Sequence, residues 1–208
     1  MILFLTIISL IKSNSDKKIL ETPKSSNIQS LKSKDGKQKK ISLSGSCGVN
    51  AQFNLENDYL AITGSGDMTN FDPNTIPWKD SLKQIKTSRV NKGITSIGSY
   101  SFYQCTHLLS IVIPRTIEKI GDHAFYCCYR LFTINFPDSI NSIGSFSFYK
   151  CRRLPEISLP QSITTIGESA FTYCLSLYYV QIPRNLKEIP AYFLSKCRYL
   201  PSITIPDD

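Results

Sequence analysis

Residues 117–137 read IEKIGDHAFYCCYRLFTINFP, and residues 163–183 read ITTIGESAFTYCLSLYYVQIP. Aligned with each other, the two stretches share isoleucines, a glycine, an Ala-Phe pair, a cysteine and a final proline. The same spacing runs from Ile94 to the end of the chain, so residues 94–208 divide into five units of 23 residues without an insertion. A strict repeat of this length predicts a solenoid, in which each unit is one coil stacked on its neighbours.

Apolar residues fill most of the repeated columns. Stacking turns each column into a continuous buried ladder, which a single unit could not form alone. The columns begin at Ile94, Ile97, Phe102, Leu108 and Ile111, and each recurs every 23 residues.

Each unit is expected to contain one short strand and one short helical segment. In residues 108–114 the apolar positions 108, 111 and 113 favour a strand, and Pro114 then stops ladder pairing. Before the strand, Phe102, Cys105 and Leu108 lie three residues apart, which places them on one face of a helical turn. Ser99, which follows Gly98, is placed to cap the start of that segment.

The charge of the chain is concentrated near its start. The formal net charge is +8, but residues 12–40 hold nine lysines against three acidic residues. Residues 41–208 therefore carry 15 basic and 13 acidic side chains, a net of +2. A nearly neutral folded part does not fit a nucleic-acid-binding domain, which normally presents a basic face.

The first forty residues resemble a targeting segment and a linker. Residues 1–11 are apolar but too short to span a bilayer, and with Ser13 and Ser15 they fit a secretory signal peptide over residues 1–15. A buried strand, or a wrongly assigned gene start, is the alternative. Residues 16–40 are rich in Lys and Ser and are expected to be a disordered linker, although they could also be a polybasic arm.

The seven cysteines suggest a buried spine of reduced thiols. Five of them form a column of the repeat, where parallel side chains are poorly oriented for disulfides. Cys47 and Cys127 lie outside the column and are expected to be the freer thiols. The sequence contains no C-x-x-C pair, so no zinc site and no other cofactor is expected. The cysteine column consists of Cys105, Cys128, Cys151, Cys174 and Cys197.

No catalytic residues are expected. The two histidines, His107 and His123, stand alone at variable positions of the repeat, with no partners to form a triad. An enzyme on a parallel β-helix, of the kind that cuts polysaccharides, would need carboxylates clustered on one sheet face. Here the outward strand positions offer only Glu156, with Asp138 and Asp207 beyond the turns.

The outward positions of the strands are the candidates for ligand binding, because they vary while the core columns do not. An unconstrained, solvated face would show the same variation and remains the alternative. A second candidate contact stripe is a ladder formed by Tyr103, Tyr126 and Tyr149. The residues selected as ligand-binding are Asn135, Glu156, Ser158, Tyr179, Gln181 and Arg184.

The pattern L-x-x-I-x-I-P followed by x-x-x-I-x-x-I-G-x-x-A-F-x-x-C resembles the leucine-rich repeat of the BspA-like family. Residues 45–98, with Gly45-Ser46-Cys47-Gly48 and Pro77-Trp78, resemble the hairpin cap that opens many members. The resemblance implies a secreted or surface-displayed protein of the kind found in bacteria and anaerobic protists, which adheres to other proteins or cells. Its partners would be a host or matrix protein, or a cell-surface glycan.

Together these observations predict an α/β solenoid: a leucine-rich repeat horseshoe of five coils with short parallel strands, preceded by a β-hairpin cap. The cap is assigned to residues 41–92 and the repeat domain to residues 93–208. The expected function is adhesion through the strand face, without enzymatic activity or a transmembrane segment. The β-helix enzyme and an intracellular scaffold are the alternatives. The uncapped fifth coil could also pair edge to edge with another copy.

Overall fold

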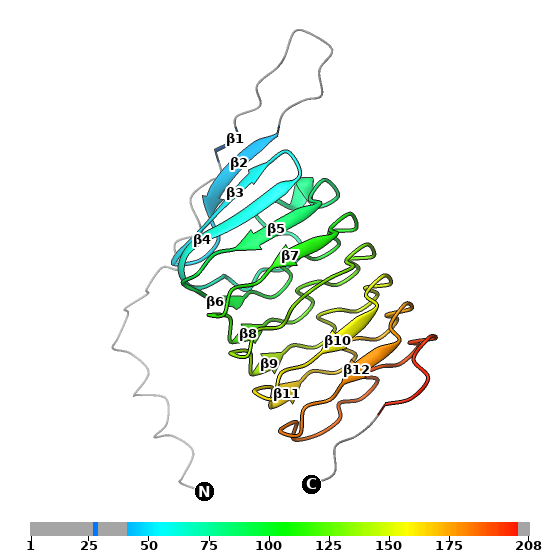
Figure 1. Ribbon diagram of the computed structural model, residues 1–208. Coiled ribbons are helices and arrows are strands. Elements are labelled where there is room, and N and C mark those ends of the chain that lie inside the picture. The colour runs from blue at the N-terminus through cyan, green and yellow to red at the C-terminus, as the bar shows by residue number, and fades with distance from the viewer. Residues whose placement is uncertain (1–26, 29–40, 204–208) are drawn as a thin grey trace, which may run out of the picture.

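The computed structural model describes residues 41–203 and the backbone of residues 27–28. The expected signal peptide and most of the expected linker lie outside the described residues. So does Thr204, an outward strand position of the fifth unit. Within them, the chain winds into a stack of coils that carries two ladders of short parallel strands (Figure 1). The predicted repeat solenoid is therefore present.

The first ladder contains the strands expected before each repeat proline. In it, β5 (Thr87–Val90) pairs with β7 (Ser110–Val112), and β10 (Glu156–Ser158) pairs with β12 (Tyr179–Gln181), all parallel. In the coil after β7 the strand is reduced to a single bridge between Ser110 and Thr133. Each pair is offset by 23 residues, as the repeat predicts.

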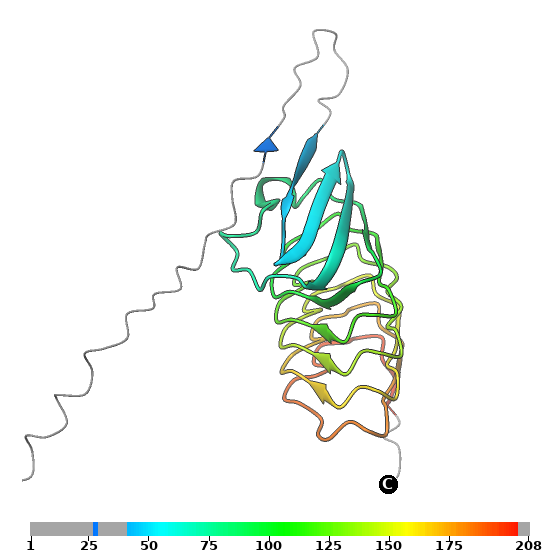
Figure 2. The ribbon, with the colours of Figure 1, turned by 90° about the vertical axis from the view of Figure 1, so that its left-hand side faces the viewer.

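The second ladder was not predicted from the sequence. It is formed by β6 (Ile94–Ile97), β8 (Lys119–Ile120), β9 (Ser142–Ile143) and β11 (Thr165–Ile166), which pair in parallel. These strands lie along a different side of the coils from the first ladder, and Figure 2 shows them one above another. They contain the second isoleucine of the I-x-x-I-G motif, which is buried in every one of them.

Antiparallel strands precede the coils. The two-residue strand β1 (Asn27–Ile28) pairs with β2 (Ser42–Ser46), which pairs with β3 (Asn50–Glu56), which in turn pairs with β4 (Tyr59–Asp67). The last of these, β4, also pairs in parallel with both β5 and β6, so this sheet leads into both ladders of the coils.

The prediction of a helical segment in each unit was wrong. The described residues contain one helical element, the 3₁₀ turn η1 (Lys79–Ser81), which precedes the repeats. In the repeats, left-handed residues such as Tyr100 (φ 60°) and Gln104 (φ 56°) interrupt each segment, and they recur in every following coil. A helix cannot continue through such residues, so the segment folds into successive turns.

The turns send alternate backbone N–H groups into the next coil rather than along their own chain. Tyr100, Phe102 and Gln104 donate to carbonyl oxygens of residues 122, 124 and 126 at 2.7–3.0 Å. The side chain expected to cap a helix serves the same purpose, because Ser99 Oγ accepts a hydrogen bond from the Asp122 N–H at 3.1 Å. Bonds between coils thus replace the bonds of a helix, and the fold is a β solenoid rather than an α/β one.

The core follows the predicted columns. The rings of Phe102, Phe125, Phe148 and Phe171 are fully buried and stack with centroids 5.0–5.1 Å apart. Burial of one such side chain contributes on the order of 1.5–3 kcal/mol. The apolar ladders are therefore the main source of stability in the coils.

The cysteine column belongs to the same core as the phenylalanines, and from Cys128 onward each thiol points at the preceding coil. Cys128 Sγ donates to the Phe102 carbonyl at 3.2 Å, and Cys151 Sγ repeats this contact with Phe125 at 3.4 Å. The expectation that Cys47 and Cys127 are freer thiols was wrong, because both are buried. Cys47 lies in the core cluster, and its position outside the repeat column does not bring it to the surface.

No helix in residues 41–203 is long and apolar enough to cross a membrane.

Candidate functional site

The outward side chains of the first strand ladder form one continuous exposed surface, which we call the strand face. It comprises residues 109–112, 132–135, 155–158 and 178–181, in four consecutive coils (Figure 1). Within it, Ile111, Ile157 and Val180 point inward and are buried. Backbone pairing fixes the spacing of the outward residues within the first two of these coils and within the last two.

Five of the six predicted binding residues lie on the strand face and are exposed. Glu156 is directly opposite Tyr179, and Ser158 is opposite Gln181 in the parallel register. The Ser158 hydroxyl donates to Gln181 Oε1 at 3.3 Å. Asn135 lies one coil earlier, in the column of Ser158. The structure therefore brings Glu156, Ser158, Tyr179 and Gln181 together, and that they bind a ligand stays a prediction.

Arg184 lies apart from this group. It follows Pro183 in the turn beyond β12, where its backbone N–H donates to Gln161 Oε1 at 2.9 Å. Its side chain is exposed, but the residue is not part of the ladder. Pro183 ends the strand before Arg184. The proline column of the repeat could have indicated this.

The sequence interpretation missed an apolar row on the strand face. Phe132 and Tyr178 are each 55% exposed, and Leu109 is 37% exposed. The Phe132 N–H donates to the Leu109 carbonyl at 3.0 Å, and the Tyr178 N–H to the Pro155 carbonyl at 2.8 Å, so the row follows the stacking of the coils. With Val112 and Tyr179, both 50% exposed, it makes this face unusually apolar for a solvent-facing surface.

The turns beside the strand face carry a second distinctive surface. The predicted tyrosine ladder is present: Tyr126 stacks on Tyr103 and Tyr149 with centroids 5.1 and 5.0 Å apart. Cations cover the neighbouring rings, with Arg152 4.6 Å from the centre of Tyr129 and Lys150 5.7 Å from that of Tyr173. Burial raises the pKa of Tyr126, the middle ring, to about 12, so its hydroxyl remains uncharged at neutral pH.

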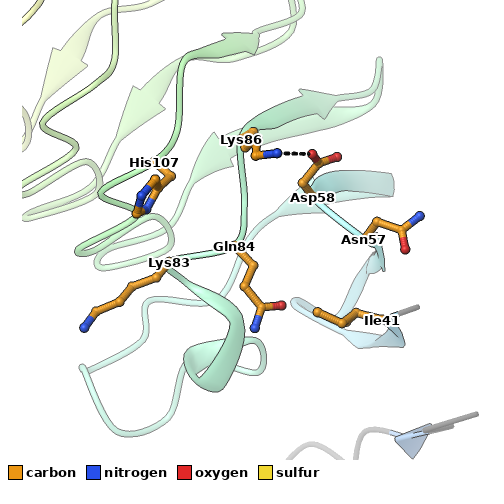
Figure 3. A pocket seen from close by; sticks show the side chains of 7 residues that line it. All are labelled: Ile41, Asn57, Asp58, Lys83, Gln84, Lys86 and His107. Atoms are coloured by element: carbon orange, nitrogen blue, oxygen red, sulfur yellow. Dashed lines mark ion pairs between the residues drawn. The ribbon is translucent and has the colours of Figure 1, made fainter. Parts of the chain in front are cut away.

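A pocket of about 580 Å³ lies between the antiparallel strands and the first coil (Figure 3). Its charged groups do not converge on a common point. Lys86 pairs with Asp58 at 3.0 Å, and Lys83 extends away from that pair. The pocket therefore lacks the convergent polar groups expected of a small-molecule site. It is lined by Ile41, Asn57, Asp58, Lys83, Gln84, Lys86 and His107.

The two histidines have no catalytic arrangement. His107 contacts the neighbouring Thr106 hydroxyl at 3.2 Å, and His123 lies between the rings of Tyr100 and Phe146 at 4.7 and 5.2 Å. Desolvation lowers the pKa of His123, while the nearby Asp122 opposes this shift. Across the described residues, no group of three or more His, Cys, Asp or Glu side chains could hold a metal ion.

The stacked coils, the parallel ladders and the 23-residue register define a leucine-rich repeat protein. The family model of the BspA-type leucine-rich repeat region matches residues 74–208, in six copies. The chain therefore belongs to this family. The matched copies number one more than the five units counted from Ile94, and β5 has the same 23-residue offset from β7 as the strands of later coils.

Solved structures share the fold. A leucine-rich repeat protein of T. pallidum is 24% identical with a TM-score of 0.61, over 74% of this chain and 79% of that one. A leucine-rich repeat protein of Bacteroides ovatus gives the same identity and score, over 76% of this chain and 46% of that one. A leucine-rich cell surface protein of Faecalibacterium prausnitzii is 24% identical with a TM-score of 0.53, over 67% of this chain and 42% of that one. This chain thus spans less than half the length of the latter two. No curated protein sequence matches it.

Proposed function

We propose that this protein is a secreted or cell-surface binding protein that attaches to another protein through the strand face, without chemical turnover. The observation that carries the proposal is the apolar row of Leu109, Phe132 and Tyr178, exposed along the strand face. Exposed apolar side chains gathered on one surface mark a site of interaction. A solvated face without a partner would gain nothing from them.

The composition of the strand face favours a protein partner. Aromatic residues are enriched at protein interfaces, and Phe132, Tyr178 and Tyr179 provide three on the strand face, in coils two apart. Glu156 and the paired Ser158 and Gln181 supply polar groups around them. Three short strands and one bridge present a small area by the standard of stable complexes, so we expect modest affinity.

Secretion is part of the proposal. It is supported by the apolar start of the chain and the small residues Ser13 and Ser15. The solved relative from Faecalibacterium prausnitzii, described as a cell surface protein, agrees with this location. We expect the mature protein to begin near Asp16. Mass spectrometry of the native protein would contradict secretion if it found an intact Met1 end inside the cell.

We further propose that strands β2–β4 cap a solenoid of five coils. Buried aromatic contacts support this role, because Trp78, which precedes the repeats, packs edge-on against Phe53 of β3 at 4.9 Å. The Trp78 indole also donates to the Ser101 carbonyl of the first coil at 3.0 Å. These contacts cover apolar surface that the first coil would otherwise expose.

Cell binding tests the proposed function. The strand-face variant would replace Phe132, Tyr178 and Tyr179 with Ser, and its binding to epithelial cells would be measured by flow cytometry. We expect binding to fall to background, because the exposed rings supply most of the contact area. Pretreating the cells with a protease should also abolish binding of the unmodified protein, since the partner is a protein.

A matched control keeps the result specific. Val49, Ile189 and Tyr192 are also exposed but lie away from the strand face, and replacing them with Ser removes a similar apolar area. This control variant should bind cells like the parent, and both variants should keep the parent melting temperature. The proposal fails if the strand-face variant binds cells as well as its control.

A further inference from the structure

The net charge of the folded part conceals an uneven distribution. The turn segments 100–109, 123–132, 146–155, 169–178 and 192–201 contain no acidic residue and six basic ones. Residues 41–208 hold 15 basic and 13 acidic side chains, so nine basic and 13 acidic ones remain elsewhere. We call the six basic residues the basic strip; they are Arg130, Lys150, Arg152, Arg153, Lys196 and Arg198.

The strip is exposed and its charges are not neutralised by neighbours. Arg130, Arg152 and Arg153 are exposed, and Lys150 is half-buried. Across residues 41–203 the only ion pair joins Lys86 to Asp58, so no strip residue is paired with a carboxylate. The nearest acidic residue along the chain is Glu156, which lies on the strand face.

Aromatic contacts hold the centre of the strip in place. Arg152 lies over Tyr129 of the preceding coil, with 4.6 Å from its guanidinium carbon to the ring centre. Lys150 lies over Tyr149 of its own coil and Tyr173 of the next, at 5.2 and 5.7 Å. Such contacts restrict long side chains that would otherwise move freely, so less entropy is lost when an anion binds.

We propose that the basic strip binds a sulfated polysaccharide lying along the axis of the solenoid. Arginine guanidinium groups match the oxygen pairs of oxyanions, and three of the four central cations are arginines. Arg130 and Arg153 hold the same position in adjacent coils, and the pairs Lys150/Lys196 and Arg152/Arg198 do so in coils two apart. Stacked tyrosines of adjacent coils are 5.0–5.1 Å apart. A linear chain with an anionic group on successive units can therefore contact several coils at once.

The rings that line the four central cations argue against a single-stranded nucleic acid as the partner. Proteins that bind single strands usually offer free aromatic faces on which bases stack. Here Tyr126 is stacked between Tyr103 and Tyr149, and a cation covers the ring of Tyr129. A sulfated polysaccharide requires only the charges and hydrogen-bond donors that remain exposed.

Heparin is a suitable probe, with the full chain as the protein. The strip variant would combine Arg130→Gln, Lys150→Gln, Arg152→Gln and Arg153→Gln. The control variant would remove the same number of charges outside the turn segments, through Lys79→Gln, Arg115→Gln, Lys119→Gln and Lys187→Gln. Titration calorimetry at several salt concentrations would give the affinity and its salt dependence.

We expect the strip variant to bind heparin about tenfold or more weakly than the control, with a shallower dependence on salt, because several anion contacts are lost. The double variant Arg130→Gln/Arg153→Gln leaves all three cation–tyrosine contacts intact and should show an intermediate loss. This separates the loss of charge from any effect on folding, which melting curves would also report.

Two results would overturn the inference. Equal heparin affinity in the strip and control variants would place the binding elsewhere, for example on the lysines of residues 12–40. Competition by duplex DNA or by polyglutamate as strong as that by heparin would show that the strip does not select a sulfated polysaccharide. The inference is independent of the strand-face proposal. The strip variant leaves the strand face unchanged, so it should still bind cells grown without sulfation.

Discussion

The ring of Phe125 lies almost parallel to that of Phe148 in the next coil, with centroids 5.0 Å apart and an angle of 11° between the planes. Both rings are fully buried. Each is also in contact with a second phenylalanine on its other side, Phe102 or Phe171. A change at one position therefore affects the coils on both sides of it.

The first prediction concerns this column. Phe148→Ala should reduce the free energy of unfolding by about 3–5 kcal/mol, the range for removing a buried aromatic ring. Urea denaturation would measure the change. The control is Phe132→Ala on the strand face, which should alter stability by less than about 0.5 kcal/mol. Equal stability of the two variants would mean that the column is not interior.

The second prediction concerns a glycine that has no room for a side chain. A Cβ atom at Gly144 would lie 2.6 Å from the Asp122 nitrogen and from the Gly121 carbonyl carbon, both in the preceding coil. Gly144→Ala should therefore push two coils apart and destabilise the protein by about 1–3 kcal/mol. Ser142→Ala, in the neighbouring strand β9, is the control and should melt like the parent. A normal melting temperature for Gly144→Ala would contradict the close stacking of the coils.

The third prediction concerns cysteine reactivity. Desolvation raises the pKa of Cys128 and Cys174 well above the ordinary value, and that of Cys197, in the last coil, to about 11. The reactive thiolate is therefore scarce at neutral pH. Iodoacetamide should label the four buried cysteines of the column only after denaturation. Cys197, which is partly exposed, should react before them. Mass spectrometry of labelled peptides would identify each site, and rapid native labelling of Cys128 would show that the spine is open.

The fourth prediction concerns the pH dependence of stability. Desolvation lowers the pKa of His123 below its ordinary value of 6.5, so the unfolded chain takes up a proton first as the pH falls. The contribution of His123 is thus complete above pH 6.5 and is lost as the pH falls through the folded-state pKa. We expect the melting temperature to decline between about pH 7 and pH 5.

Two variants isolate this contribution of the histidine. His123→Phe extends the stack between Tyr100 and Phe146 and removes the titrating group, so the melting temperature should decline less over this range. His107→Gln should leave the decline unchanged. If both variants follow the parent curve, groups other than His123 control it.

The buried columns of the coils could be predicted from the sequence because they depend only on spacing. In columns such as those of Phe102 and Cys105, successive residues are 23 positions apart, and their burial follows from stacking alone. The backbone between these columns could not be read in the same way. Phe102, Cys105 and Leu108 have the spacing of a helix face, but left-handed residues such as Gln104 produce turns with a similar side-chain spacing. Gln104 has no sequence signature of that conformation.

The surface was harder to predict than the core. The alternation within β10 and β12 correctly indicated the outward residues Glu156 and Tyr179. The apolar row was missed because Phe132 and Tyr178 lie one position before the strand, where alternation gives no direction. The basic strip was missed because its members occupy three different columns of the repeat, and the net charge averages them with the acidic residues of other turns.

The hydrogen bonds between coils determine how a protein of this kind can change in length. Each coil offers the same N–H groups to the coil that follows it and the same carbonyl groups to the coil before it. A duplicated unit of 23 residues, inserted in frame, would find matching partners on both sides, whereas an insertion of another length would move the phenylalanine column out of line. The exposed surface can therefore gain or lose whole coils while the packing of the interior stays the same.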